Sequence, residues 1–419
     1  MKNRKPVLIF TAILLLATII FNLGSCALPI AAESLMDGVK ARSISPLDDL
    51  SRHNAAVTDF AVRLLNATDE NGKNTFISPV SVIAALAMTA NGANGDTLSE
   101  MERVLGMTSD ELNLYLYTYL NSLPNGDKYK LLVANSIWFT DDDNLTVNKD
   151  FLQKNADYYG AEIYKTPFNN QTKRDINSWA YKNTDGMIPK ILDQIPDAAI
   201  MYLINTLAFE AEWPEYYKKE QVHSGVFTKE SGEEQDAKLM YSTEGTYLSD
   251  DNATGFIKYY SGRKYAFAAL LPNEGITVSD YIASLDGEKL STMLANPTYT
   301  TVKTAIPKFK TEYEVEMSKI LSNMGMPTAF NVTFADFSRL GSYDELNIYI
   351  GRVLHKTYIE VAEKGTKAGA VTIVEMKAGS AAPSDEPKVV YLDRPFVYMI
   401  IDCENNIPLF IGTMTDIEK

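Results

Sequence analysis

The side chains that could act as nucleophiles or metal ligands are few. The sequence has three histidines and two cysteines, and they do not form the clustered Cys and His spacing from which zinc sites are mostly built. A Ser/His/Asp hydrolase needs a histidine beside an exposed serine, but G-x-S-x-G, H-E-x-x-H and the phosphate-binding glycine motifs are missing. The sequence therefore predicts a protein that is not an enzyme and binds neither metal nor cofactor.

Each of these side chains has a plainer structural interpretation. His53 and His223 are expected at the surface, and Cys403, which follows an apolar run, is expected to be a thiol at the end of a strand. The acidic run 141–144 (DDDN) resembles a calcium loop only loosely, because the glycine at the sixth position and the distal glutamate are missing. We interpret it as a solvated turn between a strand and a helix.

Composition places the chain among large globular proteins. Its 419 residues are 46% hydrophobic and 22% charged, and no linker rich in Pro, Gly or charge divides it after residue 47. We therefore expect a single domain over residues 47–419, and a monomer. The net charge is −15, which leaves no basic face of the kind that binds phosphates, so nucleic acid is not expected as a partner.

The first residues are typical of an export signal. Lys2, Arg4 and Lys5 precede an uncharged apolar run, Val7–Phe21. This run is shorter than the roughly 20 helical residues that span a bilayer, so we interpret it as a signal peptide rather than a membrane helix.

The residues that follow the apolar run define the type of signal. Residues 23–26 (LGSC) resemble the lipobox of bacterial lipoproteins. The resemblance implies that residues 1–25 are removed and that Cys26 is lipidated, with residues 26–46 as a tether that has no clear helical or strand period. The protein would then be exported and held by lipid in a bacterial envelope membrane, such as the outer membrane on its periplasmic or surface side. The alternative is an ordinary secretory signal cleaved nearby and an extracellular protein.

Helices are expected first and strands later, which favours an α+β fold. Apolar spacing predicts helices near 47–65 and 79–90, a third capped by Thr97, and a fourth from Ser109 or Asp110. Apolar runs predict two strands buried on both faces, at 130–139 and 201–209, with a helix at 176–181 between them. After Trp213 only one helix, about 314–325, is expected among strands at 256–260, 265–271, 300–306, 353–361, 389–392, 396–401 and 409–412.

Short motifs spread along the chain resemble those of one family, the serpins. They lie in family order from about residue 47 to 415, so the resemblance covers nearly the whole chain after the tether. The matching segments are 74–81 (NTFISPVS), 92–97 (GANGDT), 134–139 (ANSIWF), 203–206 (LINT) with Trp213, 307–309 (PKF), 324–326 (MGM) with 329–330 (AF), 355–360 (HKTYIE), 363–368 (EKGTKA), 394–396 (RPF) and 409–412 (LFIG).

The resemblance implies a single domain of three β-sheets and eight or nine helices, with an exposed reactive loop at about 363–388. It further implies an irreversible inhibitor of serine proteases, in which the cleaved loop inserts into the large sheet while the protease is still acyl-linked. Cysteine proteases are a further possible target class. The alternative is a non-inhibitory serpin that binds or stores a ligand.

The loop sequence favours insertion, because an inserted strand must bury every second side chain. The odd positions 367, 369, 371, 373, 375 and 377 carry all the charges. The even positions are small or apolar, namely Thr366, Ala368, Ala370, Thr372, Val374 and Met376. The resemblance assigns the loop hinge to Glu363, Gly365, Thr366, Ala368, Gly369 and Ala370.

The scissile bond is predicted within a five-residue window. Cleavage after Lys377 suits trypsin-like proteases, cleavage after Ala378 suits elastase-like ones, and cleavage after Gly379 would be unusual. We predict that the window offers more than one usable bond; its residues are Met376, Lys377, Ala378, Gly379 and Ser380.

The resemblance also assigns residues beneath the loop. Ser78, Ser81, Asn205 and His355 are expected to form a buried polar cluster under the central strands, and Trp213 to lie under the entry point of the loop. These residues are expected to gate insertion and not to catalyse.

Overall fold

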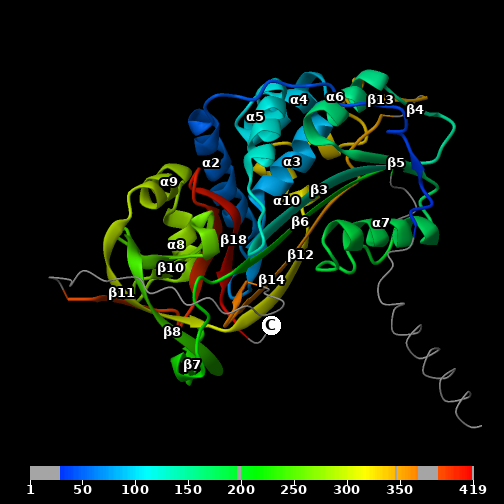
Figure 1. Cartoon of the computed structure of the whole chain (residues 1–419). Helices are drawn as coiled ribbons and strands as arrows, with labels where there is room; N and C mark the ends of the chain where they lie inside the picture. Colours follow the sequence, from blue (N-terminus) through cyan, green and yellow to red (C-terminus); the bar gives the residue numbers. More distant parts are fainter. Residues whose placement is uncertain (1–28, 196–199, 345–346, 367–385, 418–419) are drawn as a thin grey trace, which may run out of the picture.

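The computed structural model describes residues 29–195, 200–344, 347–366 and 386–417. These residues form nine α-helices and three sheets, which confirms the predicted α+β class (Figure 1). The helices are α2 (Ser51–Thr68), α3 (Pro79–Ala90), α4 (Gly95–Leu105), α5 (Ser109–Ser122), α6 (Lys149–Tyr159), α7 (Asn170–Asn183), α8 (Val278–Ser284), α9 (Gly287–Ala295) and α10 (Ser318–Met324).

A seven-stranded sheet, here called the large sheet, runs through the middle of the molecule. Helix α3 packs on one face with the main core, and α7 packs on the other with a second, smaller core (Figure 1). Burial on both faces explains why its central strands read as continuous apolar runs. In spatial order the strands are β1 (Glu33–Ser34), β5 (Glu162–Thr166), β3 (Tyr129–Thr140), β6 (Met201–Glu212), β15 (Gly365–Thr366), β14 (Arg352–Ala362) and β12 (Phe309–Glu316).

The other strands form a nine-stranded and a two-stranded sheet. The nine-stranded one contains β16 (Lys388–Tyr391), β11 (Thr298–Pro307), β8 (Glu234–Ser249), β9 (Ala253–Tyr259), β10 (Tyr265–Pro272), β17 (Phe396–Asp402), β18 (Ile407–Met414) and β2 (Thr75–Ile77), with β7 (Val222–Thr228) paired to β8. The two-stranded one pairs β13 (Gly341–Tyr343) with β4 (Leu145–Val147).

The local sequence explains the helix starts, with two corrections. Ser78 caps α3 and Pro79 opens it, as expected. Thr97 is not a cap, because α4 already starts at Gly95; its Oγ1 instead accepts a hydrogen bond from the Asp336 amide at 2.9 Å. The helix predicted from Glu314 starts later, because Glu314 belongs to β12, in which alternate residues are buried.

The prediction of a single helix after Trp213 was wrong. Helices α8 and α9 precede α10, but they have only 7 and 9 residues. Such short segments complete two turns or so, and they show too little helical periodicity to be recognised in a sequence.

The described part of the tether is packed against the domain, which corrects the expectation of a segment without strand structure. Strand β1 pairs with β5, and Leu35, Met36 and Val39 pack against the main core. Farther along, the carboxylate of Asp157 accepts hydrogen bonds from the Arg42 amide at 2.7 Å and its Nε at 2.8 Å. The apolar residues of this segment lack a period because each contacts a different element.

We expect Asp157→Ala to release this segment at neutral pH. Burial alone would raise the pKa of the Asp157 carboxyl, but the hydrogen bonds from Arg42 outweigh burial and lower it. A lowered pKa means that the contribution is complete above the usual value of about 3.9 and is lost as the pH falls below it. Limited proteolysis with thermolysin at neutral pH and pepsin at acid pH would therefore cut the wild-type segment only in acid. Asp150→Ala, an exposed residue of the same helix, is the control and should leave this pattern unchanged.

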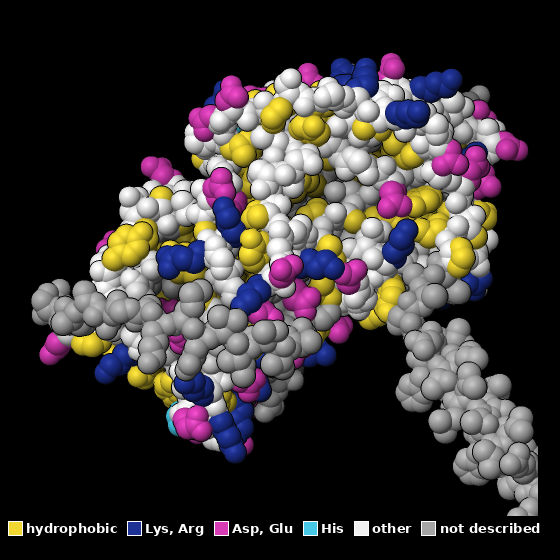
Figure 2. Space-filling view, in the orientation of Figure 1, with side chains coloured by type: hydrophobic (Ala, Val, Ile, Leu, Met, Phe, Trp, Pro, Cys, Tyr) yellow, Lys and Arg dark blue, Asp and Glu magenta, His cyan; other side chains and the backbone are white. Residues whose placement is uncertain are grey.

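The described surface has no single apolar face. On the side seen in Figure 2, basic and acidic side chains are interspersed and apolar ones form separate patches. The exposed large hydrophobic residues are Val226, Tyr299, Val332, Phe334 and Val389. Across the described ranges, none of the helices has the length and apolar character needed to cross a membrane.

Candidate functional site

The short strand β15 lies between two strands that are paired directly lower in the sheet. Gly365 and Thr366 are opposite Glu212 and Ala211 of β6, and on the other side they are opposite Ala362 and Val361 of β14. Strands β6 and β14 are parallel to each other, and β15 is antiparallel to both. Gly365 and Thr366 therefore form a two-residue strand between β6 and β14 at one end of the large sheet.

Below the hinge the large sheet is closed. Residues 352–355 of β14 pair directly with residues 202–205 of β6, so the last of these pairs joins His355 to Asn205. Between this closed part and β15, residues 206–210 of β6 and 356–360 of β14 are not paired with each other. We call this unpaired stretch of the two strands the slot.

Gly365 is required by both its conformation and its close contacts. Its φ is +149°, which side chains rarely adopt, and a Cβ built there would lie 2.0 Å from the Ala211 carbonyl oxygen. Only glycine fits between the two strands at this point.

We expect Gly365→Ala to displace β15 from the sheet, because the clash is with backbone atoms that cannot move aside. Hydrogen exchange of the peptide that contains residues 209–213 should become faster, and the melting temperature of the intact protein should fall. The matched control is Gly275→Ala, which also has a positive φ, +85°, but has nothing within 4 Å of its Cβ. Equal exchange in the two variants would contradict the role of close packing.

Thr366 is held by a stack of two aromatic rings. It is 2% exposed, and its hydroxyl lies 2.5 Å from the hydroxyl of Tyr260. The Tyr260 ring stacks on the Trp213 indole, with centroids 4.4 Å apart and an angle of 4° between the planes. Trp213, predicted under the entry point of the loop, therefore reaches Thr366 through Tyr260.

The segment Trp213–Tyr217 holds the chain that leads into the hinge. The Trp213 indole N–H donates to the Ala362 carbonyl at 3.0 Å, and its amide donates to the Lys364 carbonyl at 2.9 Å. The Tyr217 amide donates to the Glu363 carbonyl at 3.0 Å. Three consecutive carbonyls directly before β15 thus accept hydrogen bonds from one segment, which directly follows β6.

Glu363 also has a side-chain partner in Lys308, which lies between β11 and β12. Its carboxylate accepts a hydrogen bond from Lys308 Nζ at 2.8 Å. Burial alone would raise its pKa, but this hydrogen bond and charge outweigh burial and lower it. Both side chains are about a third exposed, so this ion pair is a modest contribution to the hinge.

The predicted polar cluster is buried below the slot, where it joins the start of α3 to β14 and β18, and β6 to β3. The Ser78 amide donates to His355 Nε2 at 3.0 Å, and the Ser78 hydroxyl donates to the Leu409 carbonyl of β18 at 2.8 Å. The Asn205 amide donates to the Asn135 side chain. Among the described residues, neither Ser81 Oγ nor Asn205 Oδ1 has a hydrogen-bond partner.

His355 is a neutral histidine. Burial lowers its pKa to about 4, and no charged group contributes to the shift. Because Nε2 accepts a hydrogen bond from an amide, the neutral ring carries its proton on Nδ1. A proton on Nε2 would place two donors against each other, so this side chain holds the Ser78 amide only while it is uncharged.

The structure places the remaining predicted residues as follows. Cys403 is part-buried after β17, and burial raises the pKa of its thiol to about 12, which disfavours the thiolate at neutral pH. His223 is exposed and His53 is partly buried against Tyr115. The acidic run forms a turn, but between β3 and β4 rather than between a strand and a helix.

Other predicted residues lie outside the described ranges. These are Cys26, the hinge residues Ala368, Gly369 and Ala370, and the window Met376, Lys377, Ala378, Gly379 and Ser380. Their roles stay predictions.

Sequence reasoning missed Tyr260 and the residues that support Trp213. Tyr260 lies in an apolar run that gives a strand pattern and nothing more. Its contact with Thr366 joins positions 106 residues apart, so only the folded chain reveals it.

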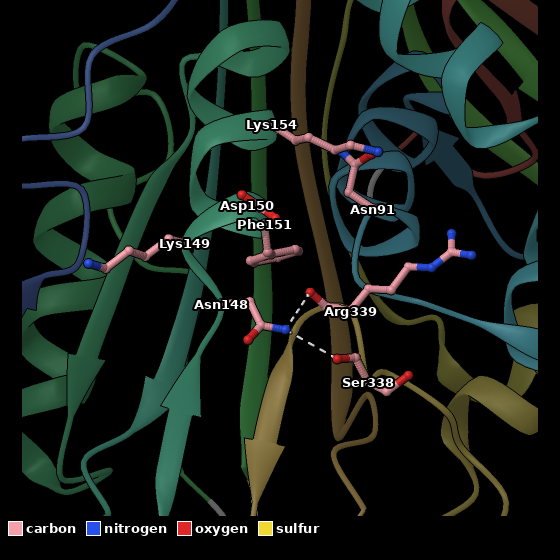
Figure 3. Close-up of a pocket in the computed structure, with 8 residues that line it drawn as sticks. All are labelled: Asn91, Asn148, Lys149, Asp150, Phe151, Lys154, Ser338 and Arg339. Atoms are coloured by element: carbon pink, nitrogen blue, oxygen red, sulfur yellow. Dashed lines mark hydrogen bonds between the residues drawn. The ribbon is translucent and has the colours of Figure 1, made fainter.

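A pocket of about 630 Å³ lies apart from the hinge (Figure 3). The Asn148 amide closes one side by donating to the carbonyls of Ser338 and Arg339, at 3.2 and 3.0 Å. The side chains of Lys149 and Arg339 point away from it (Figure 3). Within the described chain no three His, Cys, Asp or Glu side chains gather as a metal site would require.

The large sheet thus holds the two residues of β15 between β6 and β14 at one end, and β6 and β14 pair directly at the other. The family model described as Serpin (serine protease inhibitor) matches residues 55–417, and the chain belongs to the serpin family. Serpins are generally protease inhibitors rather than enzymes.

Individual relatives agree with this assignment. An uncharacterized serpin-like protein of Thermococcus kodakarensis is 29% identical over 86% of this chain and 84% of its own length. Serpin B6 of Pongo abelii is 29% identical over 84% of this chain and 96% of its own. The solved native state of tengpin, a thermophilic serpin, is 45% identical, covers 92% of this chain and 99% of its own, and gives a TM-score of 0.87. The latent state of tengpin gives 0.78 at 42% identity, with 90% and 100% covered.

Proposed function

We propose that this protein is an irreversible suicide-substrate inhibitor of serine proteases. The catalytic serine of the protease attacks a carbonyl carbon of the loop, the peptide C–N bond breaks, the new amine leaves, and an acyl ester joins the two proteins. Insertion of the cleaved loop into the large sheet then traps that ester. The observation that carries the proposal is β15, a two-residue strand already seated between β6 and β14.

The register of β15 supports insertion of the predicted stretch. Ala211 is ten residues from the first residue of β6, so a strand that continues from Thr366 in the same register would reach the end of β6 with Met376. Strand β6 is therefore long enough to pair with the whole stretch from Thr366 to Met376 once the direct pairs between β6 and β14 have opened.

The faces of the strands support it as well. Leu203, Leu207, Phe209 and Ala211 of β6 face the main core, and Thr366, opposite Ala211, is buried. Because side chains alternate along a strand, the even loop positions would enter the main core and the odd positions would face the side of α7, where Lys367 would lie opposite the partly exposed Glu210. An inward Lys or Glu would cost several kcal/mol, roughly the penalty for an unpaired buried charge.

The polar cluster gains a partner in the inserted form. In the same register Thr372 would lie between Asn205 and His355, six residues beyond Thr366. Its hydroxyl is a donor suited to Asn205 Oδ1, which has no partner in the described residues. After cleavage the inserted loop would pair with β6 on one side and with β14 on the other, in place of their direct pairing. Asn205 Oδ1 would then gain a hydrogen-bond donor.

The experiment is to mix the protein, without residues 1–25, with trypsin-like, elastase-like and subtilisin-like proteases. A denaturing gel would detect a covalent complex, and mass spectrometry of the released C-terminal fragment would locate the bond between Met376 and Ser380. More than one fragment mass across the proteases supports broad specificity, and one mass with all of them contradicts it. Clean cleavage without a complex, and without a rise in melting temperature, contradicts inhibition.

We also propose that the protein is exported and anchored by lipid at Cys26. The proposal is supported by the charged start, the apolar run and the lipobox-like LGSC. Labelling with a radioactive fatty acid in a bacterial host tests it, with Cys26→Ser as the control. Label on both proteins, or on neither, contradicts lipidation at Cys26.

A further inference from the structure

A buried ion pair lies in the nine-stranded sheet beneath the hinge. Lys258 of β9 and Glu244 of β8 are joined by a hydrogen bond of 2.7 Å, and their side chains are 10% and 14% exposed. Ion pairs this well buried are unusual, because both charges lose their hydration. No sequence motif predicts this pair, and neither residue takes part in the mechanism above.

The Lys258 cation faces two aromatic rings as well as the carboxylate. Its Nζ lies 5.2 Å from the centroid of the Trp213 indole and 4.8 Å from that of the Tyr217 ring. Both distances are within the range of cation–π attraction. Burial alone would lower the pKa of Lys258, but Tyr217 and Glu244 outweigh it and raise the pKa, so the side chain is charged at neutral pH.

Serine and threonine side chains fix the other side of the pair. The Ser242 hydroxyl donates to Glu244 at 2.7 Å and lies 3.0 Å from the Tyr217 hydroxyl. It also lies 3.0 Å from the Thr304 hydroxyl of β11. Glu244 and Tyr217 are thus held in place by the same group, and Lys258 lies between them.

The two rings are the ends of the segment Trp213–Tyr217, which binds the three carbonyls of residues 362–364. Trp213 also stacks on Tyr260, whose hydroxyl contacts Thr366. A continuous series of contacts therefore runs from Lys258, through the two rings, to the hinge on both its backbone and its side chain.

We propose that Lys258 is a positioning residue for the trap, a cation that holds the segment Trp213–Tyr217 so that β15 stays seated before cleavage. The inference rests on the proposed inhibitory function and adds the residue that prepares the hinge. When β15 is seated, the residues that follow it in the cleaved loop can extend the same strand and pair with β6 and β14 without delay. Without the cation the hinge leaves its seat more often, insertion starts later, and more acyl ester is hydrolysed before it is trapped.

Lys258→Met keeps the length of the side chain and removes the cation. Hydrogen exchange of uncleaved protein should become about tenfold faster in the peptide that spans residues 213–217, the size expected from losing attraction to two rings. This measurement does not depend on inhibition. Lys258→Arg, which keeps a cation, should restore slow exchange. Unchanged exchange in Lys258→Met would overturn the proposal.

The second readout is the number of inhibitor molecules consumed per protease molecule trapped. This number should rise several-fold in Lys258→Met, while the rate of the first cleavage stays the same, because neither Lys258 nor the residues that it contacts belong to the predicted window 376–380. The double variant Lys258→Met with Glu244→Gln leaves no unpaired buried charge and should behave like the single one. A double variant that behaves like wild type would overturn the proposal, because the unpaired Glu244 would then be the cause.

The outcomes separate the two proposals. If wild type forms no covalent complex but Lys258→Met still loosens residues 213–217, the proposed function fails and the positioning contact stands. If wild type and Lys258→Met both trap proteases and consume the same number of inhibitor molecules per protease trapped, inhibition stands and the role of Lys258 is overturned.

Discussion

Replacing Thr366 with arginine should convert the inhibitor into a substrate. Thr366 is buried against Tyr260, and its side chain is the first that faces the main core from the loop. A guanidinium at this position would have to be buried without a carboxylate beside it, at a cost of several kcal/mol. The loop would then be cut as before, but insertion would fail at its first step.

The expected result of Thr366→Arg is complete cleavage with no covalent complex on a denaturing gel. The cleaved variant should also lack the rise in melting temperature that insertion produces. Thr366→Ser is the matched control, because it keeps the hydroxyl that contacts Tyr260, and it should form the complex. A stable complex with Thr366→Arg would show that the hinge does not have to enter the sheet.

His355→Gln should make the stability of the intact protein less dependent on pH. The pKa of His355 is lowered to about 4, below the value of about 6.5 expected when the chain is unfolded. A lowered histidine pKa means that the unfolded state binds the proton more readily. The wild type therefore loses stability as the pH falls from 6.5 toward 4, by at most about 1.4 kcal/mol per pH unit.

Over that interval the wild type should lose roughly 3 kcal/mol relative to His355→Gln, measured by urea unfolding at several pH values. The exposed His223→Gln is the control and should follow the wild type. The preference among proteases should stay the same in His355→Gln, because His355 lies below the slot and not in the reactive loop. An altered preference would contradict its assignment to the core. Equal pH dependence in all three proteins would contradict the buried neutral histidine.

The parts of the fold that sequence could predict are those with long, regular patterns. The apolar runs of β3 and β6 and the Ser78-Pro79 start of α3 were found within a few residues. The short helices α8 and α9 were missed, since 7 and 9 residues show little periodicity. The docking of residues 29–46 was missed because its anchor, Asp157, lies 115 residues from Arg42.

The site divides in the same way. Trp213 and His355 stand in motifs that resemble those of the family, so they could be chosen before the structure was known. The partners that give them their chemistry could not. The sequence around Tyr260, Lys258 and Glu244 shows only an ordinary strand pattern. The role of these residues follows from the side chains that the two sheets bring into contact with them.

In the proposed mechanism, the length of β6 below the hinge sets how far a captured protease is carried. Each residue that enters a strand advances the chain by about 3.3 Å, so ten residues from β15 to the first residue of β6 correspond to about 33 Å. That displacement is comparable with the diameter of a small domain. If the proposed mechanism holds, deleting two residues between the hinge and the scissile bond would shorten this displacement by about 7 Å.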